Sequence, residues 1–128
     1  MDKKYIELFK ELASSTAVSA DKVMDYDIEK QDKSGYEAAQ TMRDNYEDLK
    51  DRISKDNYVL TKSDAAKLTI GVMILINQLQ DHDNTIKKAI TSYKEDLLPK
   101  LQEIVDNAEN DEMANQMANE KFIIKNNE

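Results

Sequence analysis

The chain has 128 residues, with no cysteine, two glycines, one proline and a formal net charge of −8. The missing cysteines exclude disulfides, zinc–thiolate sites and thiol catalysis. The negative charge argues against binding to nucleic acid or to anionic membranes, because both are polyanions. We therefore expect one soluble cytoplasmic domain over residues 1–128, and the excess of Lys, Asn, Asp and Ile over Arg, Pro and Gly favours a bacterial source.

Few turn residues and many helix-forming residues predict an all-α fold. Residues 2–13 (DKKYIELFKELA) place apolar side chains at helical spacing, and a packing face resumes at Val23, Met24 and Ile28. Between them, the segment 14–20 (SSTAVSA) is rich in small and β-branched residues, which weaken helices. The pattern leaves open whether 2–31 is one helix or two, and we favour one long or kinked helix.

The next part of the chain predicts a turn and a second helix. Lys33, Ser34 and Gly35 mark the turn, with Ser34 as a candidate N-cap. Apolar residues at helical spacing then indicate a helix over 36–53. The following connection ends in the apolar residues 58–60, which we expect to lie on the bundle.

The longest predicted helix is the element around which the others are arranged. It opens at Thr61 with a capping pattern in which Asp64 replaces the preferred Glu or Gln. Its stretch 68–76 (LTIGVMILI) is almost entirely apolar, and a helix that is hydrophobic on all sides must be covered on all sides. Apolar residues continue at helical steps through 61–108, past Pro99, where the missing N–H predicts a kink.

Two further features complete the predicted bundle. Gly71 lies inside the apolar stretch at a cost of roughly 1 kcal/mol against alanine, so we expect it to let another helix approach closely. Asn110 is a candidate N-cap for a last helix that has Asp111 and Glu112 in its first turn. The sequence thus predicts an all-α, up-down helical bundle of four main helices, or five if the chain breaks at 14–19.

Metal and catalytic patterns are weak. The single histidine, His82, lies between two aspartates, but neighbouring residues on a helix point about 100° apart and cannot close on one ion. Carboxylate pairs three residues apart resemble the ligands of magnesium-dependent all-α nucleotide hydrolases, yet a chain with 26 acidic residues produces such pairs by chance. These pairs are Glu29/Asp32, Glu103/Asp106 and Glu109/Glu112. We assign no metal, no cofactor and no enzyme activity, and keep a magnesium-dependent nucleotide hydrolase as an alternative.

Residues 12–28 contain a degenerate helix-turn-helix pattern, with Ala17 at the turn position that glycine usually occupies. The segment 20–32 is then the recognition helix, and it carries five acidic and two basic side chains. Such a helix repels phosphates, and counterion release requires cations on the protein. A DNA-binding regulator is therefore a further alternative, and we predict no binding to nucleic acid.

An acidic bundle without a reactive constellation favours a non-catalytic protein–protein interaction or regulatory module. Its candidate partner-binding surface combines an acidic run with two adaptable methionines. These residues are Glu103, Asp106, Glu109, Asp111, Glu112, Met113 and Met117. The partner is an unidentified protein or a second copy in a homodimer, since the short last helix is expected to leave an apolar strip uncovered.

Overall fold

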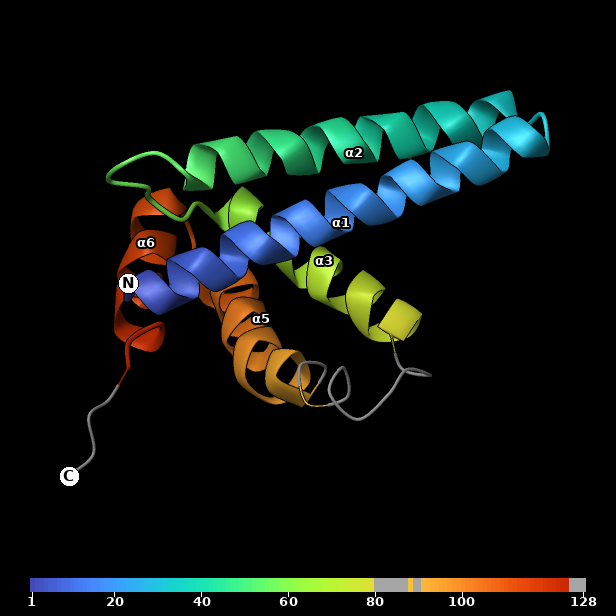
Figure 1. Cartoon of the computed structure of the whole chain (residues 1–128). Coiled ribbons are helices and arrows are strands. Elements are labelled where there is room, and N and C mark those ends of the chain that lie inside the picture. The colour runs from blue at the N-terminus through green and yellow to red at the C-terminus, as the bar shows by residue number, and fades with distance from the viewer. Residues whose placement is uncertain (80–87, 89–90, 125–128) are drawn as a thin grey trace.

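The computed structural model describes residues 1–79, 88 and 91–124 (Figure 1). In this part of the chain there are five α-helices, one π-helical turn and no strand. They are α1 (Lys3–Glu29), α2 (Lys33–Ile53), α3 (Lys62–Leu79), the π-helical turn η1 (Tyr93–Leu97), α5 (Leu98–Asn107) and α6 (Asp111–Lys121). The prediction of an all-α helical bundle is confirmed.

Helices α1 and α2 form an antiparallel hairpin (Figure 1). Helix α1 runs through 14–19 without interruption, so the prediction of one helix is confirmed and the additional break is absent. Thr16 in this segment is fully buried, and its hydroxyl donates to the carbonyl of Leu12 at 2.8 Å, which satisfies it inside the helix. A helix-turn-helix needs a turn near Ala17. Because α1 is continuous there, the segment 12–28 does not have the geometry of the helix-turn-helix alternative.

The hairpin turn begins with a left-handed residue. The amides of Gln31 and Asp32 donate to carbonyls of the last turn of α1 at 3.1 and 2.8 Å, which is a Schellman arrangement. Gln31 has φ 57° at the position where glycine is usual. Asp32 then caps α2 by accepting from the Gly35 amide at 2.9 Å. The predicted cap, Ser34, lies inside α2, which begins earlier than the sequence indicated.

The predicted single helix over 61–108 is wrong. Helices α3 and α5 pack side by side (Figure 1), which two ends of one continuous helix cannot do. An apolar ladder at helical spacing is the same for one long helix and for two helices in series, because both present one apolar face. The ladder positions Ile86 and Ile90, and also His82, lie outside the described residues.

Pro99 lies in the first turn of α5, directly after the π-helical turn over 93–97. Proline has no N–H, and its ring crowds the carbonyl four residues back. A π-helical turn is a common place for such an interruption of the hydrogen-bond ladder. The helical path continues through Pro99, as the apolar ladder indicated, while the kink stays a prediction.

The core lies where α1, α3, α5 and α6 meet and extends under α2. Its fully buried large side chains include Phe9, Leu12, Leu49, Ile53, Leu68, Val72, Leu101, Ile104 and Phe122. The Phe122 ring lies edge-on to Phe9 at 4.9 Å between centroids and 5.2 Å from Tyr5. The Asp2 amide also donates to the Phe122 carbonyl at 2.8 Å, so the end of α6 is held against the start of α1.

Helix α3 is not covered on all sides as predicted. Leu68, Val72 and Leu75 are buried, whereas Ile70 and Met73 are 52% and 49% exposed. Helices α1, α5 and α6 pack on α3 and leave the side that carries these two residues open to solvent. The hydrophobic run therefore does not report a fully enclosed helix.

Gly71 lies where α1 and α3 cross. A Cβ atom at this position would lie 2.9 Å from the Thr16 hydroxyl oxygen, 3.5 Å from Tyr46 Cε1 and 3.8 Å from Leu12 Cγ. The first distance is shorter than any ordinary contact, so the two helices approach as closely as a glycine allows. The prediction of a close helix approach at Gly71 is confirmed.

The start of α3 is capped as predicted, with one change. Thr61 Oγ1 accepts from the Asp64 amide at 3.0 Å. The Asp64 carboxylate is buried and accepts from Arg52 at 2.6 Å and from the Tyr58 hydroxyl at 2.7 Å. These bonds hold the connection against the bundle, where Leu60 is buried, as the apolar residues 58–60 indicated.

Candidate functional site

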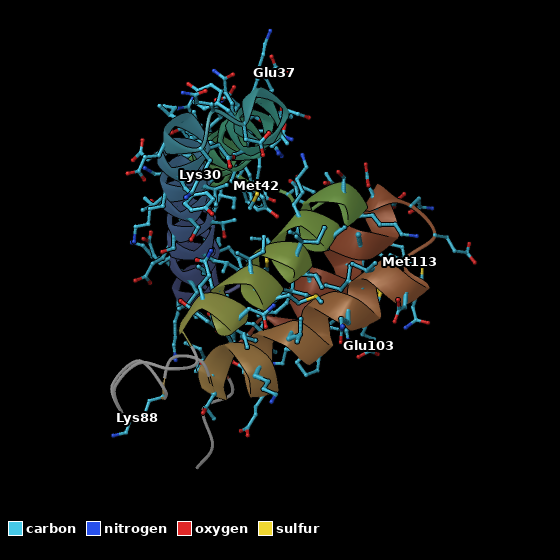
Figure 2. All side chains as sticks on the ribbon, turned by 90° about the vertical axis from the view of Figure 1, so that its right-hand side faces the viewer. Lys30, Glu37, Met42, Lys88, Glu103 and Met113 are labelled. Carbon is cyan, nitrogen blue, oxygen red and sulfur yellow. The ribbon has the colours of Figure 1, made fainter. Side chains whose placement is uncertain are left out.

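A groove lies between the half of the α1–α2 hairpin that contains its turn and the C-terminal half of α3 (Figure 2). Its volume is about 480 Å³, which falls within the range of ligand pockets. Apolar side chains from all three helices form its walls. They are Ala20 and Val23 of α1, Ala38, Ala39 and Met42 of α2, and Ile74 of α3. Figure 2 shows Met42 on the side of the hairpin that faces α3.

The groove is lined largely by small side chains. Ser19 and Ala20 of α1 and Ala38 and Ala39 of α2 fill little space beyond the interface of the two helices. Helix α3 crosses α1 and diverges from the hairpin toward its C-terminal end (Figure 1). Ser19 donates to the Gln78 side-chain oxygen at 2.5 Å and thereby ties α1 to the end of α3.

Asp27 is the single charged residue among the described residues that line this groove. Its side chain is only 7% exposed, and its Oδ2 atom has no hydrogen-bond partner in the described part of the chain. A Cβ atom at Gly35 would lie 2.9 Å from this oxygen, so the glycine makes room for the carboxylate. Buried polar atoms nearly always have partners, because an unpaired one costs free energy. The unpaired oxygen is an acceptor that a bound ligand can use.

The end of the hairpin beside the groove is acidic. Residues 21–37 contain six acidic and three basic side chains. Asp25, Glu29 and Glu37 in this segment are exposed, and Figure 2 shows Glu37 pointing outward from the end of the hairpin. The groove is therefore apolar inside and bordered by negative charge.

The predicted partner-binding residues lie on α5, α6 and the connection between these helices, and none of them lines the groove. Two of them have structural contacts. Glu103 pairs with Lys121 at 2.6 Å, and Asp111 accepts from the Lys62 amide at 3.1 Å, which joins α6 to the first turn of α3. Asn110 caps α6 as predicted, with its side chain accepting from the amide three residues later at 2.8 Å.

The remaining residues of that surface divide between solvent and core. Asp106, Glu109 and Glu112 are exposed. Met113 is 37% exposed, whereas Met117 packs against the core. All five acids of that surface and Met113 are thus accessible, although Glu103 and Asp111 also have contacts within the protein. A role for these residues in partner binding stays a prediction.

The carboxylate pairs do not gather into a metal site in the described residues, where no group of three or more His, Cys, Asp or Glu side chains could hold an ion. The pair Glu29/Asp32 spans the end of α1, and Asp32 is occupied as the cap of α2. In the pair Glu103/Asp106, Glu103 forms an ion pair within the bundle. The geometry adds no support to the magnesium hydrolase alternative.

Sequence reasoning missed Asp27. It placed Val23, Met24 and Ile28 on a packing face; Met24 is buried, as predicted, but Val23 and Ile28 are 44% and 62% exposed. The buried face of α1 instead runs through Ala20, Met24 and Asp27, at steps of three and four residues. The sequence does contain a signal for this site, which is an acidic residue in register with the buried face of α1.

None of the described helices has the length and apolar character needed to cross a membrane. Comparison of the chain with protein-family models, with curated proteins and with solved structures finds no match. The protein is an all-α bundle with an apolar groove, and a proposal of its function rests on that geometry alone.

Proposed function

We propose that the protein is a non-catalytic protein-interaction module that binds a segment of a partner protein in the groove between the α1–α2 hairpin and α3. The observation that carries this proposal is the groove itself, with apolar walls from three helices and one buried carboxylate oxygen that has no donor among the described residues. Binding sites are mostly apolar and contain a few polar groups that fix orientation. A helical or extended segment lying in such a groove is a recurring mode of peptide recognition.

The residues of the groove favour binding over catalysis. General acid–base catalysis uses a titratable side chain placed beside the reacting group, and a hydroxyl nucleophile is commonly activated by a neighbouring base. The described lining has one titratable group, Asp27, and its one hydroxyl, Ser19, is bonded to Gln78. We place the protein in the cytoplasm, in keeping with its cysteine-free composition.

The absence of native cysteine allows a direct test of this proposal. Ala38→Cys, on the exposed wall of the groove, can carry a photoactivated cross-linker, and Thr41→Cys provides an exposed control on α2 outside the lining. In a lysate of the organism that encodes the chain, we expect one partner to cross-link from Ala38→Cys and not from Thr41→Cys. Unlabelled wild-type protein should compete for this product. Equal products from both positions would contradict a partner site in the groove.

A second copy of the chain is a second candidate partner. Ile70 and Met73 form an exposed apolar strip along α3, and Met113 of α6 is also accessible. Exposed apolar strips of this kind are often covered in dimers. Sedimentation at increasing protein concentration tests this directly, and Ile70→Ser should weaken any dimer that forms through the strip. A monomer at all concentrations would remove this candidate.

A further inference from the structure

We propose that Asp27 is an anionic anchor for a lysine or arginine side chain that lies within an apolar stretch of the partner segment. This inference rests on the proposed function, and it goes further by naming the chemical group that the groove recognises. It places the cation of the partner at the Asp27 Oδ2 atom and the neighbouring apolar residues of the partner on the walls of the groove.

The hydrogen-bonding chemistry of Asp27 defines the kind of group that can bind it. An ionised carboxylate can only accept, so whatever completes Asp27 must donate. Charge-assisted hydrogen bonds from ammonium or guanidinium groups are roughly twice as strong as neutral ones. Asp27 is 7% exposed and its Oδ2 has no donor among the described residues, so a cation of the ligand can supply the donor that the surrounding helices do not.

The groove also restricts the shape of a side chain that can reach Asp27. Lysine and arginine carry a polar head on an apolar stem, which packs along apolar surface while the head finds its partner. The walls beside Asp27 are such a surface, formed by Val23, Ala38, Met42 and Ile74. Gly35 keeps the carboxylate end of the groove open, because any side chain there would meet Oδ2.

The surface around the groove is negatively charged. The hairpin end has twice as many acidic as basic side chains, and the whole chain carries −8. Exposed charges of this kind steer a cationic segment and repel an acidic one, in a manner that salt weakens. A buried charge pair instead contributes to the lifetime of the complex. The exposed acids and Asp27 therefore have separable effects, on the association rate and on the dissociation rate.

An anchor and a structural acid differ in how the protein responds when their charge is removed. A protein loses stability when a structural carboxylate is neutralised, because the bonds of that carboxylate are lost. Asp27 Oδ2 has no such bonds with the described residues, so Asp27→Asn should leave the thermal midpoint unchanged or raise it while binding of a cationic segment is weakened. Asp25→Asn is the matched control, because it removes the same charge from an exposed position two residues away.

The test is a selection of random displayed peptides on the full chain in three forms: wild type, Asp27→Asn and Asp25→Asn. We expect wild type and Asp25→Asn to enrich peptides with a lysine or arginine at one fixed place among apolar residues. Asp27→Asn should retain the apolar pattern and lose the fixed cation. Ala38→Trp, which fills the groove from an exposed position, should lose the selected peptides, whereas Thr41→Trp should keep them.

A second measurement uses the peptide rather than the protein, so that it does not depend on the folding of a variant. The selected peptide is compared with a copy in which norleucine replaces the fixed lysine, or the fixed arginine, leaving an apolar stem without a charge. We expect Asp27→Asn and the norleucine peptide each to weaken binding by about tenfold or more, and their combination to add little further loss. Asp25→Asn should change the affinity by no more than about twofold at physiological salt.

The outcomes separate this inference from the proposed function. If selected peptides depend on an open groove but carry no fixed cation, or bind Asp27→Asn as well as wild type, the anchor is refuted and the interaction site stands. If Ala38→Trp binds the selected peptides as well as wild type does, or if no peptide is enriched, both proposals are refuted.

Discussion

The crossing of α1 and α3 yields a prediction whose sign depends on one neighbouring side chain. In an exposed helix, Gly→Ala stabilises by about 1 kcal/mol, because glycine has more backbone entropy to lose. At Gly71 the added Cβ would lie 2.9 Å from the Thr16 hydroxyl oxygen. We therefore expect Gly71→Ala to destabilise the protein, in contrast to the helix-propensity rule.

The magnitude follows from what Thr16 would have to give up. Its side chain is fully buried, and its hydroxyl is held by the 2.8 Å bond to the Leu12 carbonyl. Rotating it away from the new methyl group breaks this bond, which costs about 1 kcal/mol. Overpacking of the core adds ~1–2 kcal/mol, at the lower end of its usual range. After subtraction of the gain of about 1 kcal/mol in propensity, Gly71→Ala should lower the free energy of unfolding by about 1–2 kcal/mol.

Thr16→Ala removes the obstructing atom and completes a double-mutant cycle. In that background the nearest other side-chain atoms, Tyr46 Cε1 at 3.5 Å and Leu12 Cγ at 3.8 Å, are at ordinary contact distance from the added Cβ. Gly71→Ala should then stabilise by about 1 kcal/mol, as in an open helix. The interaction free energy between the two positions should therefore be about 2–3 kcal/mol, which is large for a pair of small side chains.

Urea unfolding followed by far-UV circular dichroism measures all four proteins, since a chain of this size is suited to two-state treatment. With a slope of about 2 kcal/mol per molar urea, the expected shift of the midpoint for Gly71→Ala is roughly 0.5–1 M downward. If Gly71→Ala stabilises the wild-type and Thr16→Ala backgrounds equally, α1 and α3 do not approach each other as described here.

Three further predictions concern the cap, the buried acid and a buried tyrosine. Gln31→Gly should raise the free energy of unfolding by about 0.5–1 kcal/mol, because φ 57° strains a side chain; an unchanged thermal midpoint would contradict the left-handed cap. Asp64→Ala should cost about 2–4 kcal/mol in urea unfolding, whereas Asp48→Ala, which removes the exposed partner of the same Arg52, should leave the urea midpoint nearly unchanged. Burial raises the pKa of Tyr46 to about 12, so its neutral form stabilises the fold below pH ~10, and this contribution is lost as the pH rises toward 12. Tyr46→Phe should move alkaline unfolding to higher pH, and tyrosinate absorbance of the wild type should show a late-titrating group; normal titration of all tyrosines would contradict the burial.

The helices and several of their ends could be predicted because they depend on neighbours in the sequence. Apolar spacing of three and four residues located α1 and α2. The caps Thr61 and Asn110 accept from amides three residues later, which is a contact within one turn. Gly71 was predicted to mark a close approach, since a glycine inside an apolar helix needs a packing reason. These features require no knowledge of the rest of the chain.

Features that depend on which helix faces which were not predictable in this way. The apolar ladder over 61–108 is the same for one helix and for two antiparallel helices, and only the contact between α3 and α5 decides between them. Likewise, the stretch 68–76 is apolar on every side, yet the directions of α1, α5 and α6 decide that Ile70 and Met73 face solvent.

The sequence by itself determined that this chain is an acidic, cysteine-free all-α protein, because composition and short-range periodicity act through local backbone and solvent effects. Only the tertiary structure decided that small side chains on two helices and the divergence of a third leave a groove, and that Asp27 lies in it with no donor to its Oδ2 in the described part of the chain. The physical reason is that a hollow and an unpaired oxygen are defined by the absence of neighbouring atoms. That absence depends on the packing of all three helices and on no one segment of the chain.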